Sequence, residues 1–192
     1  MMKTQESVFI KLAEIAESKS EGTQDHLYRV AEYTHLLCKE LGVDEKQAEL
    51  VTIASLVHDI GKLAIPERII SKQGRLTDSE YEIVKEHIAY GYNMLSQAPG
   101  DFMKAAAVIA QQHHERYDGT GYLGLKGEQI HLYARIVAVA DVFDALTTDR
   151  SYKCAWSFEE ASKYMLEQSG LQFDPRIMDC FKRALPSFKT VV

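Results

Sequence analysis

Histidine and aspartate side chains interrupt the most apolar stretches of this chain, and their placement limits how it can fold. His58 and Asp59 directly follow the largely apolar residues 50–57, and Asp141 lies inside the apolar run 136–143. Burying such groups without a compensating charge costs several kcal/mol each. The fold must therefore gather them around positive charge. Imidazole and carboxylate ligands together predict a pair of divalent metal ions.

Composition predicts one domain without a nucleic-acid or membrane partner. A chain of 192 residues with 46% hydrophobic content can bury one good core. Its net charge of −6 argues against binding a nucleic-acid polymer or a membrane surface, although metal ions can still make one cleft positive for an anionic substrate. Cys38, Cys154 and Cys180 lack C-x-x-C spacing, which is typical of reduced thiols. With no signal core and no apolar span, we expect a cytoplasmic protein.

Hydrophobic periodicity is helical nearly throughout, so we predict an all-α fold. The predicted architecture is an N-terminal helix within residues 1–20 followed by a single helical bundle at residues 21–192. The first helix either packs on the bundle or pairs two subunits into a homodimer. Further helices are expected at about residues 27–41, 45–59 (capped by Asp44), 77–97, 101–113 and 131–148, with one or two more after Trp156 and an ordered glycine-rich loop at 115–129.

The pair His58-Asp59 permits two interpretations. It can form an ion pair at a helix end, joined by Lys62, or it can bind metal. The carboxylates of Asp141 and Asp144 favour metal binding, because they lie one turn apart on one helix face. Two such carboxylates facing a core repel each other unless a cation lies between them. We therefore expect Asp141 to bind the metal ion directly, and Asp144 to support the ligands without contacting the ion.

Four further histidines are candidates for the same site. His87 shares an inner helix face with Gly91, which would leave room beside the ring for an ion or substrate; a packing histidine is the alternative. Adjacent helical residues point ~100° apart, so His113 and His114 would approach a second metal from two sides, unless they form a solvated loop pair. Glu115 is expected to orient one of them, since ligating imidazoles usually donate their other N–H to a carboxylate. Spacing alone does not choose between His26 and His35.

A ligand set of imidazoles and carboxylates without thiolate favours iron or manganese over structural zinc. A carboxylate such as Asp59 can bridge two ions, which an imidazole does not do. Two ions a few ångströms apart can generate a hydroxide at neutral pH and stabilise an in-line attack on phosphorus. The residues thus predict a metallohydrolase.

The order of these motifs resembles a known family. His26, His58-Asp59 and Asp141 resemble the H…HD…D quartet of the HD phosphohydrolase superfamily. The resemblance narrows to the HD-GYP subfamily over residues 23–155. It is carried by H-D-I-G-K at 58–62, E-H at 86–87 with Gly91, H-H-E at 113–115, D-G-T-G-Y at 118–122, A-R-I at 134–136, A-D at 140–141, F-D-A-L-T-T at 143–148 and Arg150.

This resemblance implies an all-helical phosphodiesterase that hydrolyses cyclic di-GMP, with GGDEF-type signalling proteins as partners. It implies that Asp59 bridges the two ions and that Lys62 holds a phosphate oxygen in the transition state. The implied ligands of one metal are His26, His58, Asp59 and Asp141, and those of its neighbour are His87, His113 and His114. The implied substrate contacts are Lys62, Arg150 and Lys153, which would bind the phosphates, and Tyr122, which would contact a guanine. There are two alternatives. The chain could be a hydrolase of the same superfamily that acts on another nucleotide or a hybrid cyclic dinucleotide, or it could be a non-catalytic module that binds a nucleotide or a signalling protein.

The chain departs from the subfamily pattern in its loops. Leu123 stands where the namesake Gly-Tyr-Pro has proline, and His131 and Ser151 replace two further prolines. Losing these fixed φ angles loosens the loop by up to about 1 kcal/mol per site. His131 is either a helix-start residue facing water or a modulator at the cleft rim. Gly22 stands where three-metal members have a carboxylate, so we expect two metals rather than three.

Overall fold

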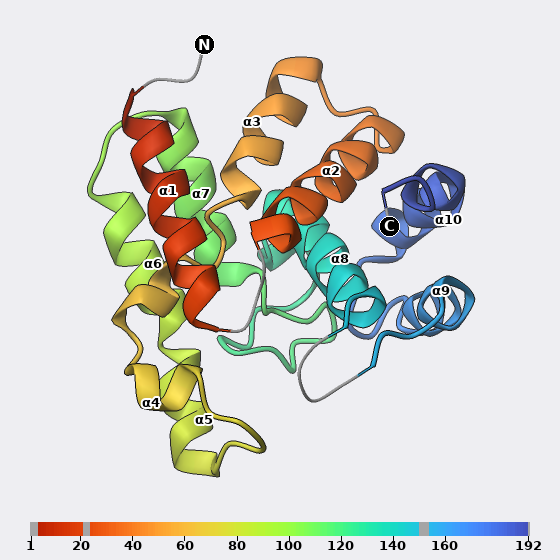
Figure 1. The fold of residues 1–192 in the computed structure, drawn as a ribbon. Helices are drawn as coiled ribbons and strands as arrows, with labels where there is room; N and C mark the ends of the chain where they lie inside the picture. The colour runs from red at the N-terminus through yellow and green to blue at the C-terminus, as the bar shows by residue number, and fades with distance from the viewer. Residues whose placement is uncertain (1–3, 21–23, 150–153, 192) are drawn as a thin grey trace.

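The computed structural model of the chain describes residues 4–20, 24–149 and 154–191 (Figure 1). These described residues form helices and loops without a β-strand, which confirms the all-α prediction. In chain order the elements are α1 (Thr4–Lys19), α2 (Gln24–Glu40), α3 (Glu45–Ser55), the 3₁₀ helix η1 (Ile60–Ala64), α4 (Glu67–Ile70), α5 (Asp78–Lys85), α6 (His87–Ser96), α7 (Asp101–Gln112), the 3₁₀ helix η2 (Gly127–Gln129), α8 (Leu132–Thr147), α9 (Phe158–Glu167) and α10 (Pro175–Phe188).

Helix α8 forms the centre of the bundle. Residues 136–140 are all buried, and the helix packs against α2, α7, α9 and α10. Around it, α3 packs on α2 and α7, and α6 lies along α7 (Figure 1). A helix buried on nearly every side places any polar residue it carries inside the protein. Asp141 and Asp144 on α8 are therefore held where several helices meet.

The N-terminal helix packs on the bundle. Ile10, Ala13 and Ala16 are buried, and α1 contacts η1 and α2. This helix was expected either to pack on the bundle or to pair two subunits. Within one chain, the structure shows it packed on the bundle. Val8 and Ile15 remain about half exposed, at 53% and 51%. Pairing of two chains, and a domain boundary at residue 20, stay predictions.

Two helices end earlier than their hydrophobic patterns predict. The helix expected to reach Asp59 ends at Ser55, and residues 56–62 continue with i→i−3 hydrogen bonds. The helix expected over 77–97 breaks at Glu86, although its predicted capping box of Thr77 and Glu80 is present. At both places a histidine ring bonds a helix carbonyl three residues back, with 2.7 Å from His58 Nδ1 to Ser55 O and from His87 Nδ1 to Val84 O. A ring-to-carbonyl bond of this kind accompanies each of the two breaks.

No helix among the described residues combines the length and apolar content that a bilayer crossing requires.

Candidate metal centre

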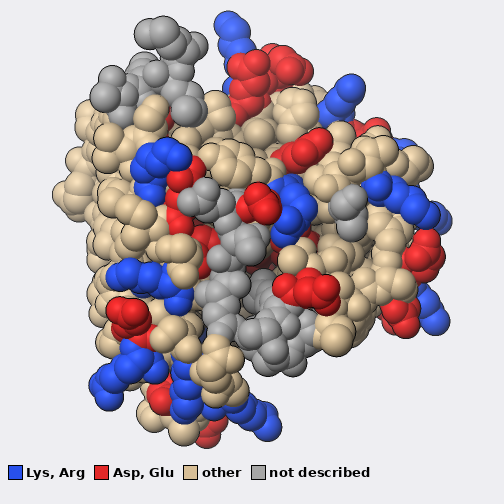
Figure 2. All heavy atoms as spheres, in the orientation of Figure 1, with Lys and Arg blue, Asp and Glu red and all other residues tan. Residues whose placement is uncertain are grey.

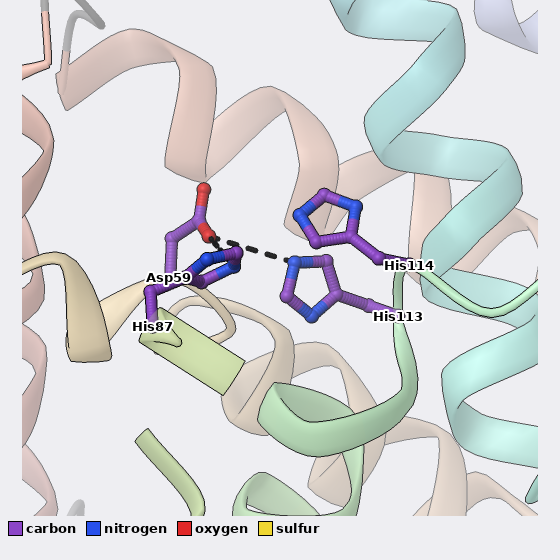
Figure 3. Close-up of side chains that lie close together, drawn as sticks. All are labelled: Asp59, His87, His113 and His114. Carbon is purple, nitrogen blue, oxygen red and sulfur yellow. Dashed lines mark ion pairs between the residues drawn. The ribbon is translucent and has the colours of Figure 1, made fainter. Parts of the chain in front are cut away.

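Two groups of ligand atoms meet in the middle of the bundle. One contains His26 from α2, Asp141 from α8, and His58, which lies between α3 and η1. The other contains Asp59, His87 at the start of α6, and His113-His114 after α7 (Figure 3). Within each group the ligand atoms lie within 4.8 Å of one another. The fold therefore brings together all seven predicted ligands, and it includes His26 rather than His35. His35 instead lies beside Thr52, with 3.4 Å between its Nδ1 and the hydroxyl.

Asp59 joins the two groups through its two carboxylate oxygens. Its Oδ1 lies 3.2 Å from His87 Nε2 and 3.5 Å from His113 Nε2, while its Oδ2 lies 3.4 Å from His58 Nε2. Asp141 Oδ1 completes the first side, 3.5 Å from His26 Nε2. Ligands bound at 2.0–2.2 Å to one ion stand roughly 3.0–3.5 Å apart from each other. These spacings match that separation, and Asp59 has the position of a bridging ligand.

The histidine rings are held so that their Nε2 atoms face the centre. Nδ1 of His58, His87 and His113 lies 2.7, 2.7 and 3.1 Å from the backbone carbonyls of Ser55, Val84 and Ile109. A carbonyl only accepts, so Nδ1 carries the proton and a neutral ring keeps its lone pair on Nε2.

The buried atoms at the centre lack hydrogen-bond partners. Among the described residues, Nε2 of His58, His87 and His113 and Oδ1 of Asp59 are buried without one. Such groups normally cost about 1–3 kcal/mol each. Three converging ring nitrogens and a carboxylate oxygen form an arrangement that a divalent cation satisfies once the rings are neutral, so the residues fit the predicted metal site.

The electrostatics of the cluster point the same way. Burial opposes the ionisation of Asp59, yet Lys62 and His58 outweigh burial and hold its pKa well below the usual range. Burial lowers the pKa of His58, but Asp59 and Asp141 reverse the effect and raise it to about 9. Burial lowers the pKa of both His113 and His114, so these rings are neutral and available as ligands. The ionised carboxylates thus attract positive charge, whether a proton or a metal ion.

Asp144 stands behind the first group of ligands, where a supporting carboxylate was expected. Its Oδ2 lies 2.7 Å from His26 Nδ1, and Arg29 donates to both of its oxygens at 2.5 and 3.0 Å. Burial raises the pKa of Asp144, but the hydrogen bonds from His26 and Arg29 outweigh burial and lower it. The Arg29 guanidinium and the ring N–H of His26 thus offset the repulsion between Asp141 and Asp144. Arg29 was not among the residues predicted from the sequence, although it lies one turn after His26 on the same helix face.

We predict that Asp144→Asn weakens metal binding about 10–100-fold without unfolding the protein, because His26 loses the carboxylate that orients its ring. Titration of metal-free protein with Mn²⁺, followed by isothermal calorimetry, measures the change. Asp149→Asn, on the same chain segment but outside the ligand network, serves as the control. An affinity equal to the wild type would show that Asp144 does not support the site.

Glu115 has a different position from the one expected. Its two carboxylate oxygens accept hydrogen bonds from the backbone N–H groups of Leu123 and Leu125, at 2.6 and 2.8 Å. The role of holding histidine rings falls instead to backbone carbonyls and Asp144. Glu115 braces the glycine-rich loop, and Gly121 permits the loop to close, since a Cβ there would lie 2.6 Å from the Cα of Glu115. The loop is ordered although Leu123, about half exposed, replaces the proline.

Gly91 also has a role that differs from the prediction. The space beside it is filled by the backbone of Gly61, whose N lies 3.4 Å from the position that a Cβ on Gly91 would take. The two glycines let η1 approach the first turn of α6. This close approach places Asp59, just before η1, within reach of His87.

A cleft of about 390 Å³ opens onto the ligands. Lys62 and Tyr122 line it together with the apolar side chains of Val84, Val142 and Leu146. Tyr122 packs against His114, with ring centroids 4.9 Å apart, and Lys85 lies 5.3 Å from its centroid. His131 caps α8 instead, where its Nδ1 accepts from Tyr133 N, so it is a helix-start residue. The predicted substrate contacts Arg150 and Lys153, together with Gly22 and Ser151, lie outside the described residues.

The fold and the site define an all-helical domain with a histidine–aspartate metal centre. The sequence model described as the HD domain matches residues 11–177. The chain therefore belongs to the HD domain family, and the resemblance to its HD-GYP subfamily is confirmed by the relatives it matches.

Curated relatives with similar sequences are phosphodiesterases. The cyclic di-GMP phosphodiesterase response regulator RpfG of Xanthomonas campestris is 44% identical over 174 residues, which cover 90% of this chain and 46% of RpfG. The 3′3′-cGAMP-specific phosphodiesterase 2 of Vibrio cholerae is 38% identical over 180 residues, or 93% of this chain and 34% of the relative. The chain thus spans less than half the length of these two relatives.

Solved structures share the fold at low sequence identity. The cyclic GMP-AMP-specific phosphodiesterase V-cGAP3 of V. cholerae superposes with a TM-score of 0.68 at 19% identity, covering 96% of this chain and 50% of that chain. The HD domain of the phosphodiesterase PgpH from L. monocytogenes, in complex with cyclic-di-AMP, gives 0.65 at 16% identity and covers 96% of both chains.

Proposed function

We propose that this chain is a metal-dependent phosphodiesterase that hydrolyses cyclic di-GMP by means of two divalent metal ions. The observation that carries the proposal is the position of Asp59, whose two oxygens face two separate groups of ligand atoms. Relatives that act on cyclic dinucleotides support the substrate class. Iron or manganese suits the ligand set of imidazoles and carboxylates.

The residues of the chain would divide the work as follows. His26, His58 and Asp141 hold one ion, His87, His113 and His114 hold the other, and Asp59 serves both. When bound, such a pair of ions supplies an activated water and offsets the charge that builds on a phosphate. The backbone carbonyls keep three of the rings aimed at the centre, and Asp144 keeps the fourth, so the site is oriented before substrate arrives.

Lys62 and Tyr122 both line the cleft and would contact the substrate there. The ammonium of Lys62 offers charge to a phosphate oxygen, and the ring of Tyr122 gives an apolar surface to a base. Figure 2 shows acidic and basic side chains interspersed over the described residues of one face, without a basic field covering it.

A second candidate substrate is 3′3′-cGAMP, because a relative specific for it is 38% identical over 93% of this chain. The two dinucleotides differ in one base, so the phosphodiester chemistry of the metal site serves both equally. The residues that contact the base decide between them.

The test is hydrolysis by protein purified with Mn²⁺ or Fe²⁺. We predict that cyclic di-GMP is cleaved to a linear product, that 3′3′-cGAMP is cleaved more slowly, and that dialysis against a chelator abolishes both reactions because the ligand residues alone supply no strong electrophile. Chromatography of the products and elemental analysis of the protein provide the readouts. Mn²⁺ added back to the dialysed protein should restore turnover. Intact cyclic di-GMP at high enzyme concentration, with two ions bound per chain, would contradict the proposal.

A further inference from the structure

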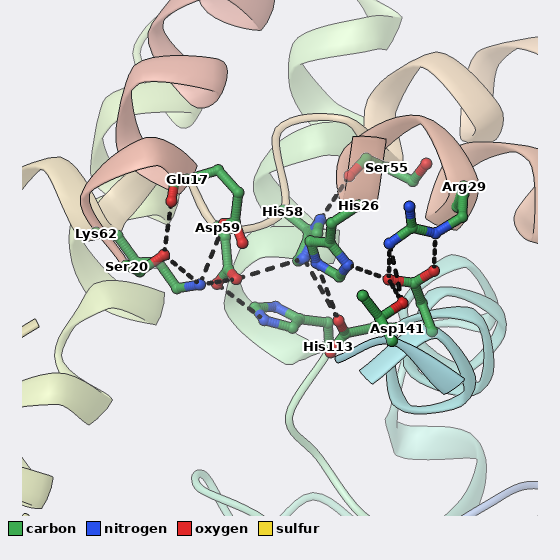
Figure 4. A network of polar contacts seen from close by, with 12 residues as sticks. Glu17, Ser20, His26, Arg29, Ser55, His58, Asp59, Lys62, His113 and Asp141 are labelled. Atoms are coloured by element: carbon green, nitrogen blue, oxygen red, sulfur yellow. Dashed lines mark hydrogen bonds and ion pairs between the residues drawn. The ribbon is translucent and has the colours of Figure 1, made fainter. Parts of the chain in front are cut away.

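The side chain of Lys62 is held from the side opposite the metal ligands by the N-terminal helix. Lys62 Nζ lies 3.2 Å from Glu17 Oε2 and 3.4 Å from Ser20 Oγ, and 2.6 Å from Asp59 Oδ2 (Figure 4). Glu17 is 3% exposed although it is a glutamate, and it belongs to α1 rather than to the motifs of the site. A glutamate is rarely so buried unless it is paired. Lys62 is the partner that accounts for its burial.

Glu17 and Asp59 hold Lys62 in different ways. Asp59 Oδ2 faces His58 Nε2 as well as Lys62, so any cation bound there competes with the ammonium for the same oxygen. Glu17 lies outside both groups of ligand atoms, so a cation bound by those groups does not compete for its carboxylate oxygens. In the metal-loaded protein, Glu17 therefore becomes the carboxylate that fixes the ammonium. A lysine side chain has many rotamers and loses much conformational entropy when it is fixed, so such an anchor matters for its placement.

We propose that Glu17 is a positioning residue that holds the Lys62 ammonium at the edge of the cleft, and thus that α1 is a working part of the phosphodiesterase site. The inference rests on the proposed function, since it assumes that Lys62 meets a phosphate oxygen. Glu17 touches neither the substrate nor the ligands; it acts through Lys62. The positioning of Lys62 gives the buried face of α1 a function beyond packing.

A double-mutant cycle tests the proposal. We expect Glu17→Gln to lower kcat for cyclic di-GMP about tenfold with little change in KM, because the charge that holds Lys62 is lost while the shape is kept. Combined with Lys62→Met, Glu17→Gln should lower activity no further than Lys62→Met alone, since coupled residues are not additive. Glu17→Asp keeps the charge but shortens the side chain, and should give an intermediate rate.

Glu14→Gln is the matched control. Glu14 lies one turn earlier on α1, is buried to the same degree at 4% exposed, and pairs with Lys11 and Tyr28 away from the site. It should keep wild-type kcat. All variants are compared at equal metal content and after urea unfolding has shown that they are folded.

The outcomes separate this inference from the proposed function. An active wild type whose Glu17→Gln variant is equally or more active would overturn the inference alone, and a rise would identify Glu17 as a competitor of substrate. A loss that persists in the Lys62→Met background would show that Glu17 supports the fold only. A wild type that cleaves bis(4-nitrophenyl) phosphate but not cyclic di-GMP contradicts the proposed substrate, while the same cycle on that simpler diester still decides the role of Glu17. A wild type inactive on both diesters overturns the proposed function and this inference together.

Discussion

Asp59→Asn is expected to reduce phosphodiester hydrolysis at least about a thousandfold, the largest loss from any single change in the site. Asparagine keeps the shape of the side chain but replaces one ligand oxygen by an NH₂ group, which cannot bind a cation. Because Oδ1 and Oδ2 of Asp59 face different groups of ligands, either orientation of the amide leaves one group without its shared oxygen. The bound metal should fall from two ions per chain to one or none. Elemental analysis and initial rates with cyclic di-GMP measure both effects.

Asp101→Asn provides the comparison for this variant, because Asp101 begins α7 and its side chain is 88% exposed. It should retain both ions and the full rate. An Asp59→Asn protein that keeps two ions and near-normal turnover would remove the bridge from the mechanism. If the wild type bound no metal and Asp59→Asn lowered only thermal stability, the pair His58-Asp59 would be the helix-end ion pair that was the other interpretation of the sequence.

The helices could be predicted from the sequence because most of them bury one continuous apolar stripe and begin at a recognisable N-cap residue or end at a glycine or proline. Asp44 and Thr77 cap the helices that they were expected to cap. The errors fall at the helix ends next to His58 and His87. There the hydrophobic period continues past the end, and a ring-to-carbonyl bond, which periodicity does not encode, accompanies each break.

The ligand set was predictable for a different reason. Buried imidazoles and carboxylates are so costly alone that finding several on apolar helices already implies a shared cation. The supporting residues carry no such signal. Glu115 has the chemistry to hold a histidine ring, but the loop folds back so that two N–H groups reach it first. Arg29 and Glu17 look like surface charges in the sequence, and their roles depend on which helices pack together.

Gly61→Ala is expected to lower the free energy of unfolding by about 4 kcal/mol, the largest stability loss among the substitutions considered. A Cβ on Gly61 would lie 1.9 Å from the carbonyl oxygen of His87 and 2.5 Å from Gly91 N. Both are backbone atoms, so no side-chain rotation relieves the clash. Either η1 or the start of α6 must move. Urea unfolding followed by circular dichroism measures the loss.

The same displacement separates the two halves of the metal centre. Asp59 precedes η1 and His87 begins α6, so moving one element against the other lengthens the 3.2 Å contact between Asp59 Oδ1 and His87 Nε2. Molecules of Gly61→Ala that remain folded should therefore lose the ion held by His87, His113 and His114. Gly42→Ala separates this clash from the general cost of replacing glycine: nothing lies within 4 Å of its Cβ, and its φ of +70° alone should cost about 1–2 kcal/mol. Equal stability losses in the two variants, with both ions retained, would show that the contact between η1 and α6 does not set the geometry of the site.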